Sequence, residues 1–285
     1  MKKIAIMTDS NSGITQKEAA GLGISVLPMP FMINDATYFE DINLTQDRFY
    51  EFLENDAVVS TSQPSPDSLI HMFHKLLAEY DEVVHIPMSS GLSGSCQTAC
   101  MLAQEPEFDG KVFVVNNQRI SVTQTQSVLD AVELAKKGYD GAQIKKILEE
   151  DKFNSSIYIM LDTLFYLKKG GRISKTVAFA GGMLNIKPVV TIQDGAVALI
   201  GKARGSRNGN NLLVEKIREA GGVDFERPVL LGYTGLSSAL LEKYVDDSKA
   251  LWADHVDKLD GCLLCSVIGT HAGPGAVAVA FFRKG

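Results

Sequence analysis

The sequence lacks long apolar runs, and this absence excludes several classes of protein. None of its hydrophobic runs approaches the ~20 residues that a membrane-spanning helix needs. Only four apolar residues, Ile4–Met7, precede Thr8 and Asp9, too few for the core of a signal peptide. We therefore expect a cytoplasmic protein with no transmembrane segment.

Cysteine is also scarce, with four residues among 285, so no disulfide framework is expected. Cys262 and Cys265 have the spacing of a CxxC motif, but they lie in an apolar run, Cys262–Ile268, that predicts a strand. Successive side chains of a strand point to opposite faces, so residues three apart cannot hold one ion together. Both are predicted to be buried core cysteines.

Common catalytic and nucleotide-binding motifs are missing as well. The chain contains no GxxxxGK[ST] phosphate loop, no GxGxxG after a strand and no GxSxG nucleophile elbow. A zinc site of His71, His74, Cys96 and Cys100 would be allowed by spacing alone and has no other support. His85 lies inside an apolar strand and is predicted to be a core residue.

Positive charge is in deficit overall but concentrated in one segment. The net charge of −6 argues against nucleic-acid binding and against a general coating of anionic membrane, and leaves only transient membrane contact open. Residues 1–167 carry 12 basic and 23 acidic side chains, residues 168–207 carry 8 and 1, and residues 208–285 carry 8 and 10. We call residues 168–207 the basic belt.

What is present in the first half indicates a parallel sheet. Short apolar runs at Ile4–Met7, Val83–Pro87 and Val112–Val115 predict strands, and Ser65–Tyr80, Gly94–Gln104 and Val122–Lys137 predict helices. Strands that alternate with helices are typical of a parallel sheet covered on both faces. We therefore predict an α/β lobe over residues 1–152.

The pattern changes in residues 153–285. Two apolar runs flank Asp194-Gly195, a pair typical of a tight hairpin turn. Further strands are predicted at Val229–Tyr233, Cys262–Ile268 and Ala276–Arg283, with helices at Asn208–Ala220 and Ser237–Asp254. The fold class is thus α/β in two lobes, the second an α+β lobe with a mixed or antiparallel sheet.

Loops rich in hydroxyl side chains follow several predicted strands, where ligands of open parallel sheets collect. These loops are Thr8–Gly13, Val58–Ser65 and Met88–Ser95. Hydroxyls, backbone amides and a helix N-terminus suit a small anion such as a carboxylate or phosphate. Capping of the helices alone would also explain the hydroxyls.

A glycine-rich run in the second half contains one histidine, His271, within Ile268–Gly275. So many glycines after a predicted strand indicate close backbone approach. A histidine in such a loop is more typical of a site than of a core. We therefore predict that His271 is a site residue.

Six motifs, taken in order, identify a family. They are Thr8-Asp9-Ser10, Thr61-Ser62-Gln63-Pro64-Ser65, Ser89-Ser90-Gly91-Leu92-Ser93-Gly94, Lys169-Gly170-Gly171-Arg172-Ile173-Ser174, Ile186-Lys187-Pro188 and Gly269-Thr270-His271-Ala272-Gly273-Pro274-Gly275. Together they resemble the DegV family of bacterial fatty-acid-binding proteins over nearly the whole chain. The sequence departs from the family at Ser95-Cys96-Gln97, commonly Thr-Tyr-Gln, and at Ala272, commonly Thr.

The resemblance implies a carrier without a catalytic engine, which buries one long-chain fatty acid between or within its lobes. By motif match, Thr61, Ser93 and His271 contact the carboxylate, with Ser62 and the amide of Gly94 close by. It also implies that the protein is the binding subunit of fatty acid kinase. A separate ATP-using subunit would convert the bound acid to acyl phosphate for phospholipid synthesis. No cofactor or metal is implied.

Two alternatives stay open at this point. One is a hydrolase or phosphotransferase that acts on an acyl substrate with Ser90 or Ser93 and His271. The other is a sensor of a different small anion.

The basic belt suggests where a kinase subunit would dock. Lys168, Lys169, Arg172, Arg204 and Arg207 could meet an acidic partner surface and speed association. Arg172 and Arg204 are the preferred candidates, since each lies beside a glycine in a predicted exposed turn. A merely solvated basic face is the other interpretation.

Overall fold

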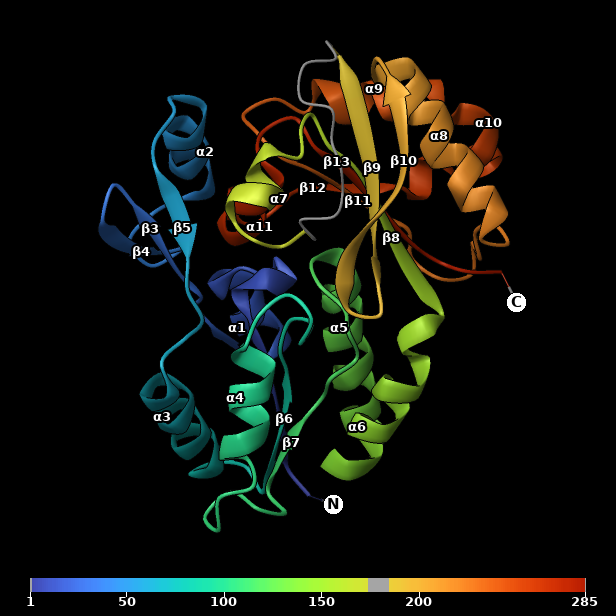
Figure 1. The fold of residues 1–285 in the computed structure, drawn as a ribbon. Coiled ribbons are helices and arrows are strands. Elements are labelled where there is room, and N and C mark those ends of the chain that lie inside the picture. Colours follow the sequence, from blue (N-terminus) through green and yellow to red (C-terminus); the bar gives the residue numbers. More distant parts are fainter. Residues whose placement is uncertain (1, 174–184, 285) are drawn as a thin grey trace.

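The first sheet has four parallel strands in the order β2-β1-β6-β7, in a computed structural model that describes residues 2–173 and 185–284 (Figure 1). The strands are β1 (Ile4–Asp9), β2 (Ser25–Leu27), β6 (Glu82–Ile86) and β7 (Val112–Val114). The helices are α1 (Gln16–Leu22), α3 (Pro66–Leu77), α4 (Ser95–Leu102), α5 (Val122–Lys136) and α6 (Gly141–Glu150). The predicted parallel sheet is confirmed.

Alternating side chains of β1 supply the two cores of this first half. Ala5 and Met7 pack with residues of α3 and α4, whereas Ile6 packs with residues of α1, α5 and α6. Ser65 accepts a hydrogen bond from the backbone of Ser68 and caps α3, as its position before a proline predicts. Both faces of the sheet are therefore covered, and its carboxyl edge is free to carry a site.

A second, antiparallel sheet of order β4-β3-β5 was not predicted, because its strands have only three or four residues. It contains β3 (Pro30–Ile33), β4 (Ala36–Phe39) and β5 (Val59–Thr61), with α2 (Gln46–Glu54) between β4 and β5. Phe31, Phe49 and Tyr50 form its core together with Cys265 and Val267 of the second half. This small unit thus joins residues that are more than 200 positions apart.

The second half forms a six-stranded sheet of order β10-β9-β8-β13-β11-β12, mixed because only β11 and β12 are parallel. Its strands are β8 (Ser155–Met160), β9 (Ile186–Gln193), β10 (Ala196–Arg204), β11 (Leu230–Tyr233), β12 (Asp260–Leu263) and β13 (Val277–Phe282). The α-helices are α7 (Phe165–Lys169), α8 (Ser206–Glu219), α9 (Ala239–Asp247), α10 (Lys249–Trp252) and α11 (Ser266–Ala272). Short 3-10 helices lie at Ser10–Ser12, Asp151–Phe153 and Ala253–Lys258. The predicted mixed sheet is confirmed, whereas the lobe boundary at residue 152 stays a prediction.

Three predictions for this half need correction. The strand predicted at Cys262–Ile268 ends at Leu263, and the apolar run continues as the buried helix α11. Cys265 is buried as expected, but Cys262 is exposed and is not a core cysteine. The helix predicted at Ser237–Asp254 is interrupted at Ser248, whose hydroxyl bonds back to the carbonyl of Tyr244.

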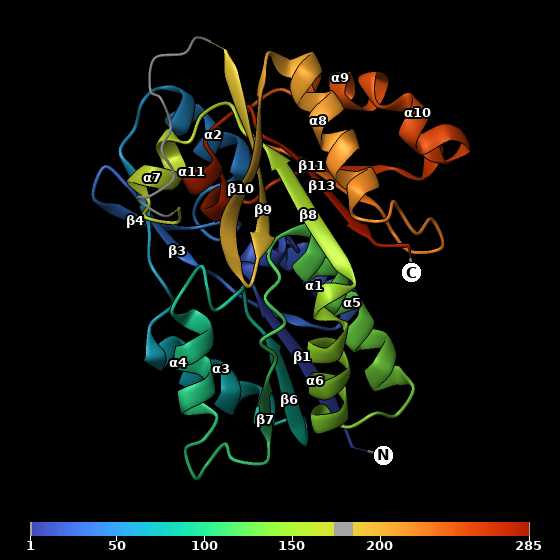
Figure 2. The same ribbon diagram turned by 45° about the vertical axis from the view of Figure 1, so that its right-hand side comes forward.

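The hairpin at Asp194-Gly195 is as predicted and carries the second half onto the first (Figure 2). Both turn residues have positive φ, 50° at Asp194 and 80° at Gly195, as a tight hairpin turn requires. The hydroxyl of Ser89 donates to the carbonyl of Gly195 over 2.7 Å. A Cβ on Gly91 would lie 2.5 Å from the same oxygen, so the contact depends on that glycine.

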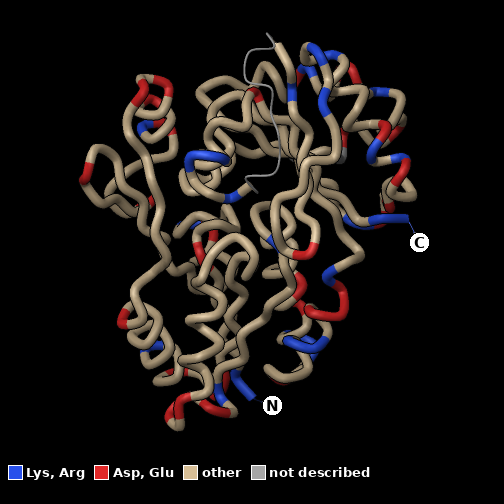
Figure 3. The backbone as a smooth tube through the Cα atoms, in the orientation of Figure 1, with Lys and Arg blue, Asp and Glu red and all other residues tan. Residues whose placement is uncertain are grey.

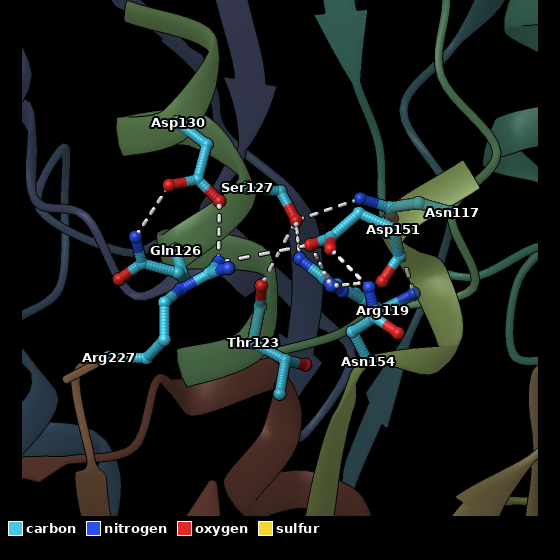
Figure 4. A network of polar contacts seen from close by, with 9 residues as sticks. All are labelled: Asn117, Arg119, Thr123, Gln126, Ser127, Asp130, Asp151, Asn154 and Arg227. Carbon is cyan, nitrogen blue, oxygen red and sulfur yellow. Dashed lines mark hydrogen bonds and ion pairs between the residues drawn. The ribbon is translucent and has the colours of Figure 1, made fainter. Parts of the chain in front are cut away.

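A polar network ties the halves together near residue 151 (Figure 4). The buried guanidinium of Arg119 donates to Ser127 over 2.9 Å and to the Asp151 carboxylate over 3.0 Å. Arg227, from the second half, reaches Asp130 over 3.6 Å and Asp151 over 3.9 Å. Burial lowers the pKa of Arg119, and its bond to Asp151 opposes that shift. The network holds the junction between the two sheets.

Candidate functional site

A cavity with a mostly apolar wall lies between the two halves. The space between its lining residues, including the part open to solvent, is about 790 Å³. One wall is a face of the second sheet, with Ile157 and Ile159 of β8, Val190 and Ile192 of β9, and Val197 of β10. Residues of the first half, among them Met29, Met88 and Leu92, form the facing wall.

Strand alternation explains this wall. Tyr158 and Met160 of β8 pack with residues of α8 and α9 on one face of the sheet, so the odd-numbered positions face the cavity. Apolar residues on both faces are usual for a sheet buried on both sides. Here one of those faces borders the cavity, and that makes room for an apolar ligand.

Polar side chains gather at one end of the cavity, which we call the mouth. Thr61 ends β5, Ser93 precedes α4, Arg172 follows α7, and His271 lies in the last turn of α11; all four line the cavity and are partly buried. Ser62 also lines it and is exposed. Two elements of the first half, β5 and α4, and two helices of the second, α7 and α11, therefore meet beside the exposed Ser62.

His271 is held by a hydrogen bond from its Nε2 to the hydroxyl of Thr61, at 2.8 Å. Burial, and secondarily the positive charge of Arg172, lowers the pKa of His271 to about 4. The imidazole is therefore neutral at pH 7, and the fixed charge of the mouth comes from Arg172. His271 was predicted in a loop but stands on a helix; its place in the site is the same.

Two glycines bring α7 and α11 together. A Cβ on Gly170 would collide with Nδ1 of His271, and a Cβ on Gly273 would collide with the ring of Tyr166. Gly273 also has a φ of 72°, which side-chain-bearing residues rarely adopt. The glycines at 170 and 273 thus allow the close contact between α7 and α11 that positions the imidazole of His271.

The sequence predicted Arg172 in an exposed turn, but in the structure its side chain is partly buried. Its Nε donates to the carbonyl of Leu92 over 3.2 Å, and its Nη1 donates to the carbonyl of Gly170 over 2.6 Å. The guanidinium therefore bridges the two halves and lines the cavity. The sequence showed that Arg172 follows two glycines, but it could not show that the side chain points towards the cavity.

The loop around Ser93 and Gly94 is fixed by local contacts. Ser93 accepts a hydrogen bond over 3.2 Å from the amide of Ser95, the first residue of α4. A Cβ on Gly94 would lie 2.6 Å from Oε1 of Gln63, so this glycine lets the loop after β5 approach closely. Gly94 itself is exposed and does not line the cavity, whereas Thr61, Ser62, Ser93 and His271 do.

Glu40 was not predicted and positions α11. Its buried carboxylate accepts from the amide of Ser266 at the start of that helix and from Gln46 over 2.8 Å. Burial raises the pKa of Glu40, and these hydrogen bonds act in the opposite direction. A negative charge at a helix N-terminus is favourable. The small sheet therefore positions both members of the Thr61–His271 pair: Thr61 lies on its strand β5, and Glu40, just after its strand β4, holds the helix that carries His271.

The geometry supports neither the Ser–His pair of the hydrolase alternative nor the metal site that residue spacing would allow. The imidazole of His271 bonds Thr61, and among the described residues no hydrogen bond joins it to Ser90 or Ser93. His85 is a core residue whose pKa burial lowers to about 4. Within residues 2–173 and 185–284, no cluster of His, Cys, Asp and Glu could hold a metal, and no helix is long and apolar enough to cross a membrane.

Comparison with known proteins places the chain in a family. A family model described as "Uncharacterised protein, DegV family" matches residues 3–284. A DegV domain-containing protein of Staphylococcus aureus strain MRSA252 is 33% identical over 286 residues, with 100% of both chains covered.

Two solved structures are similar over the whole chain. A DegV family protein from Thermus thermophilus, described for its fatty acid binding, has a TM-score of 0.86 at 29% identity and covers 99% of this chain and 100% of its own. A fatty acid binding DegV family protein from Streptococcus agalactiae has a TM-score of 0.86 at 26% identity, with 100% of both chains covered. Since the family model spans nearly the full sequence, this protein belongs to the DegV family.

Proposed function

We propose that this protein binds one long-chain fatty acid in the cavity between its halves, with the carboxylate at the mouth. Thr61, Ser93 and His271 would contact the carboxylate, with Ser62 and the Gly94 amide close by. Arg172 adds a cation to this set. The observation that carries the proposal is an apolar cavity that ends in hydroxyls, an imidazole and one guanidinium.

The energetics of such a ligand fit the wall. Burying a chain of roughly 15 methylenes gains up to about 12 kcal/mol, from which association and ordering take several kcal/mol. Most of the affinity therefore comes from Ile157, Ile192 and their neighbours. The mouth then fixes orientation, at about 1.5–3 kcal/mol for each hydrogen bond to a charged oxygen.

The exposure of Ser62 and Gly94 supports a further step. A carboxylate held beside them stays within reach of a second protein. We propose that the bound acid is presented in the cytoplasm to a separate ATP-dependent fatty acid kinase, which forms acyl phosphate for phospholipid synthesis. In this scheme the chain is a carrier that does no chemistry of its own.

Docking of that kinase would use the exposed part of the basic belt, whose segments on α7 and β10 are blue in Figure 3. Lys168, Lys169, Arg204 and Arg207 are exposed. Arg172 and Arg204 were the preferred candidates, but Arg172 faces the cavity, so a change there would affect ligand and partner together. Arg204→Glu with Lys168→Glu should slow association with the kinase and leave fatty-acid binding intact.

Ligand identification tests the proposal directly. Solvent extraction of the purified protein, followed by mass spectrometry, should release close to one fatty acid per chain. Titration of delipidated protein with oleate or palmitate should then restore the same stoichiometry. A protein that yields no lipid and binds neither acid would overturn the proposal, and release of another small anion would favour the sensor alternative.

A further inference from the structure

Two polar residues, Asn11 and Ser121, lie within the otherwise apolar wall of the cavity. Neither forms a hydrogen bond with the polar residues of the mouth. Asn11 follows β1, and Ser121 lies between β7 and α5. Both are buried, at 0% and 4% exposure, and both line the cavity. The amide of Ser121 donates to the carbonyl of Asn11 over 3.1 Å, so the two residues are adjacent.

The amide group of Asn11 has one satisfied side and one unsatisfied side. Its Nδ2 donates to Oδ1 of Asp9 over 3.0 Å and also contacts Sδ of Met88 over 3.0 Å. That carboxylate oxygen accepts a bond from the backbone of Asn11 as well, which fixes Nδ2 rather than Oδ1 towards Asp9. Oδ1 of Asn11 is consequently buried without a hydrogen-bond partner. Such an oxygen calls for a donor.

Ser121 has a strained backbone conformation and does not cap the helix that follows it. Its φ is 57° and its ψ is −138°, a conformation that costs free energy for a residue with a side chain. It precedes α5 directly, yet its hydroxyl makes no capping bond to that helix. A strained residue whose hydroxyl borders a cavity instead of capping its helix is typical of a binding position.

We propose that Asn11 and Ser121 form a second polar point for a hydroxyl group on the ligand chain, so that the preferred ligand is a hydroxylated long-chain fatty acid. The ligand hydroxyl would donate to Oδ1 of Asn11 and accept a hydrogen bond from the Ser121 hydroxyl. This inference rests on the proposed fatty-acid site and adds its substrate class. A hydroxyl elsewhere in the apolar cavity would be buried unpaired, which is costly, so the two residues select the position of the hydroxyl.

A panel of stearic acids, each with one hydroxyl at a different carbon, tests this inference against unsubstituted stearic acid. One positional isomer should bind the delipidated protein at least about tenfold more tightly than the others. Ser121→Ala and Asn11→Leu should each remove most of that difference, measured in each variant as the ratio of its affinities for the preferred isomer and for stearic acid.

Thr191→Val is the matched control, because it removes a buried hydroxyl from β9 that does not line the cavity and bonds Ile157 instead. This variant should keep the isomer preference. If Asn11→Leu does not fold, since Asn11 also bonds Asp9, Ser121→Ala alone decides.

Equal or uniformly weak binding of all hydroxylated isomers by a protein that binds stearic acid would overturn this inference and leave the fatty-acid site standing; Oδ1 of Asn11 would then be served by a water molecule. A preference that survives Ser121→Ala would also overturn it. Failure to bind any acid would instead refute the proposed function.

Discussion

The loop after β1, Thr8–Gly13, and the loop after β6, Met88–Ser95, carry similar small hydroxyl residues at the same edge of one parallel sheet. In the first loop, the buried Asp9 carboxylate accepts four hydrogen bonds: from the amides of Asn11 and Met88 and from the side chains of Asn11 and Gln124. In the second loop, Ser93 lines a cavity and is only partly buried. Four donated bonds around the first loop are thus taken by an internal anion, whereas in the second loop the Ser93 side chain lines the cavity.

This difference shows that composition alone does not identify an anion site. Hydroxyls and amides bind a ligand only through donors or acceptors that the protein itself leaves free. Asp9 is that group in the first loop, and burial raises its pKa while the four donated bonds oppose the rise. The predictions below change one loop at a time.

Removal of the internal anion should have the largest effect. Asp9→Ala removes the acceptor of the backbone amides of Asn11 and Met88 and of Nδ2 of Asn11, whereas Gln124 keeps its bonds to Thr8 and Ile86. The free energy of unfolding should therefore fall by at least about 3 kcal/mol. Urea denaturation of the apo protein measures it. Ser62→Ala, an exposed hydroxyl of the mouth, is the control and should change stability by less than about 0.5 kcal/mol. Equal midpoints for Asp9→Ala and wild type would show that this loop is not closed by Asp9.

Loss of the cation at the mouth should come next. Arg172→Ala should weaken fatty-acid binding by about tenfold or more, because a charged hydrogen-bond donor to the carboxylate is removed. Arg172→Lys should restore part of the affinity. Arg204→Ala, a basic-belt residue exposed to solvent, should leave the dissociation constant unchanged in the same titration. Equal effects of the two alanine variants would remove Arg172 from the site.

The hydroxyls of the open loop should have a smaller effect than Arg172. Thr61→Ala with Ser93→Ala should weaken binding by up to about tenfold, since neutral hydroxyls contribute less than a guanidinium. The circular-dichroism spectrum should stay that of the wild type. Unchanged affinity, measured by isothermal titration, would mean that neither hydroxyl holds the head group.

Acidification is a test of a different kind, because it changes stability through protonation and needs no substitution. His271 and His85 both have a folded-state pKa of about 4, below the ordinary value of 6.5. The unfolded chain therefore binds more protons between these values, so stability is fully present above pH 6.5 and declines as the pH falls towards 4. His271→Gln should make the dependence of the unfolding free energy on pH shallower in that window. An unchanged slope would mean that His271 is already charged in the folded protein.

The sequence predicted the parallel sheet and the Asp194-Gly195 hairpin because each rests on a local signal. Alternation of strands and helices needs no knowledge of packing, and the hairpin needs only two residues of positive φ. The error at Cys262–Ile268 has a physical cause: a short apolar run fits a buried strand and a buried helix equally well. Only the contact of Cys265 and Val267 with the small sheet favours the helix.

Most of the residues proposed at the mouth could be named from the sequence, but their contacts could not. Motif resemblance supplied Thr61, Ser93 and His271, which the structure places on one cavity. The direction of Arg172 depends on carbonyls of Leu92 and Gly170, and the latter lies only two residues before it. Glu40 could not be found, because its partner Ser266 lies 226 residues away. Long-range contacts of this kind leave no trace in a single sequence.

The bond between Ser89 and Gly195 has a consequence for kinetics. The hairpin turn crosses from the second half to the loop that leads to Ser93, so this contact joins the two halves on either side of the cavity. If the proposed ligand leaves by separation of the halves, its residence time depends on the rate at which such contacts break as well as on affinity. Ser89→Ala should therefore shorten the lifetime of the complex more than it raises the dissociation constant, as stopped-flow exchange would show.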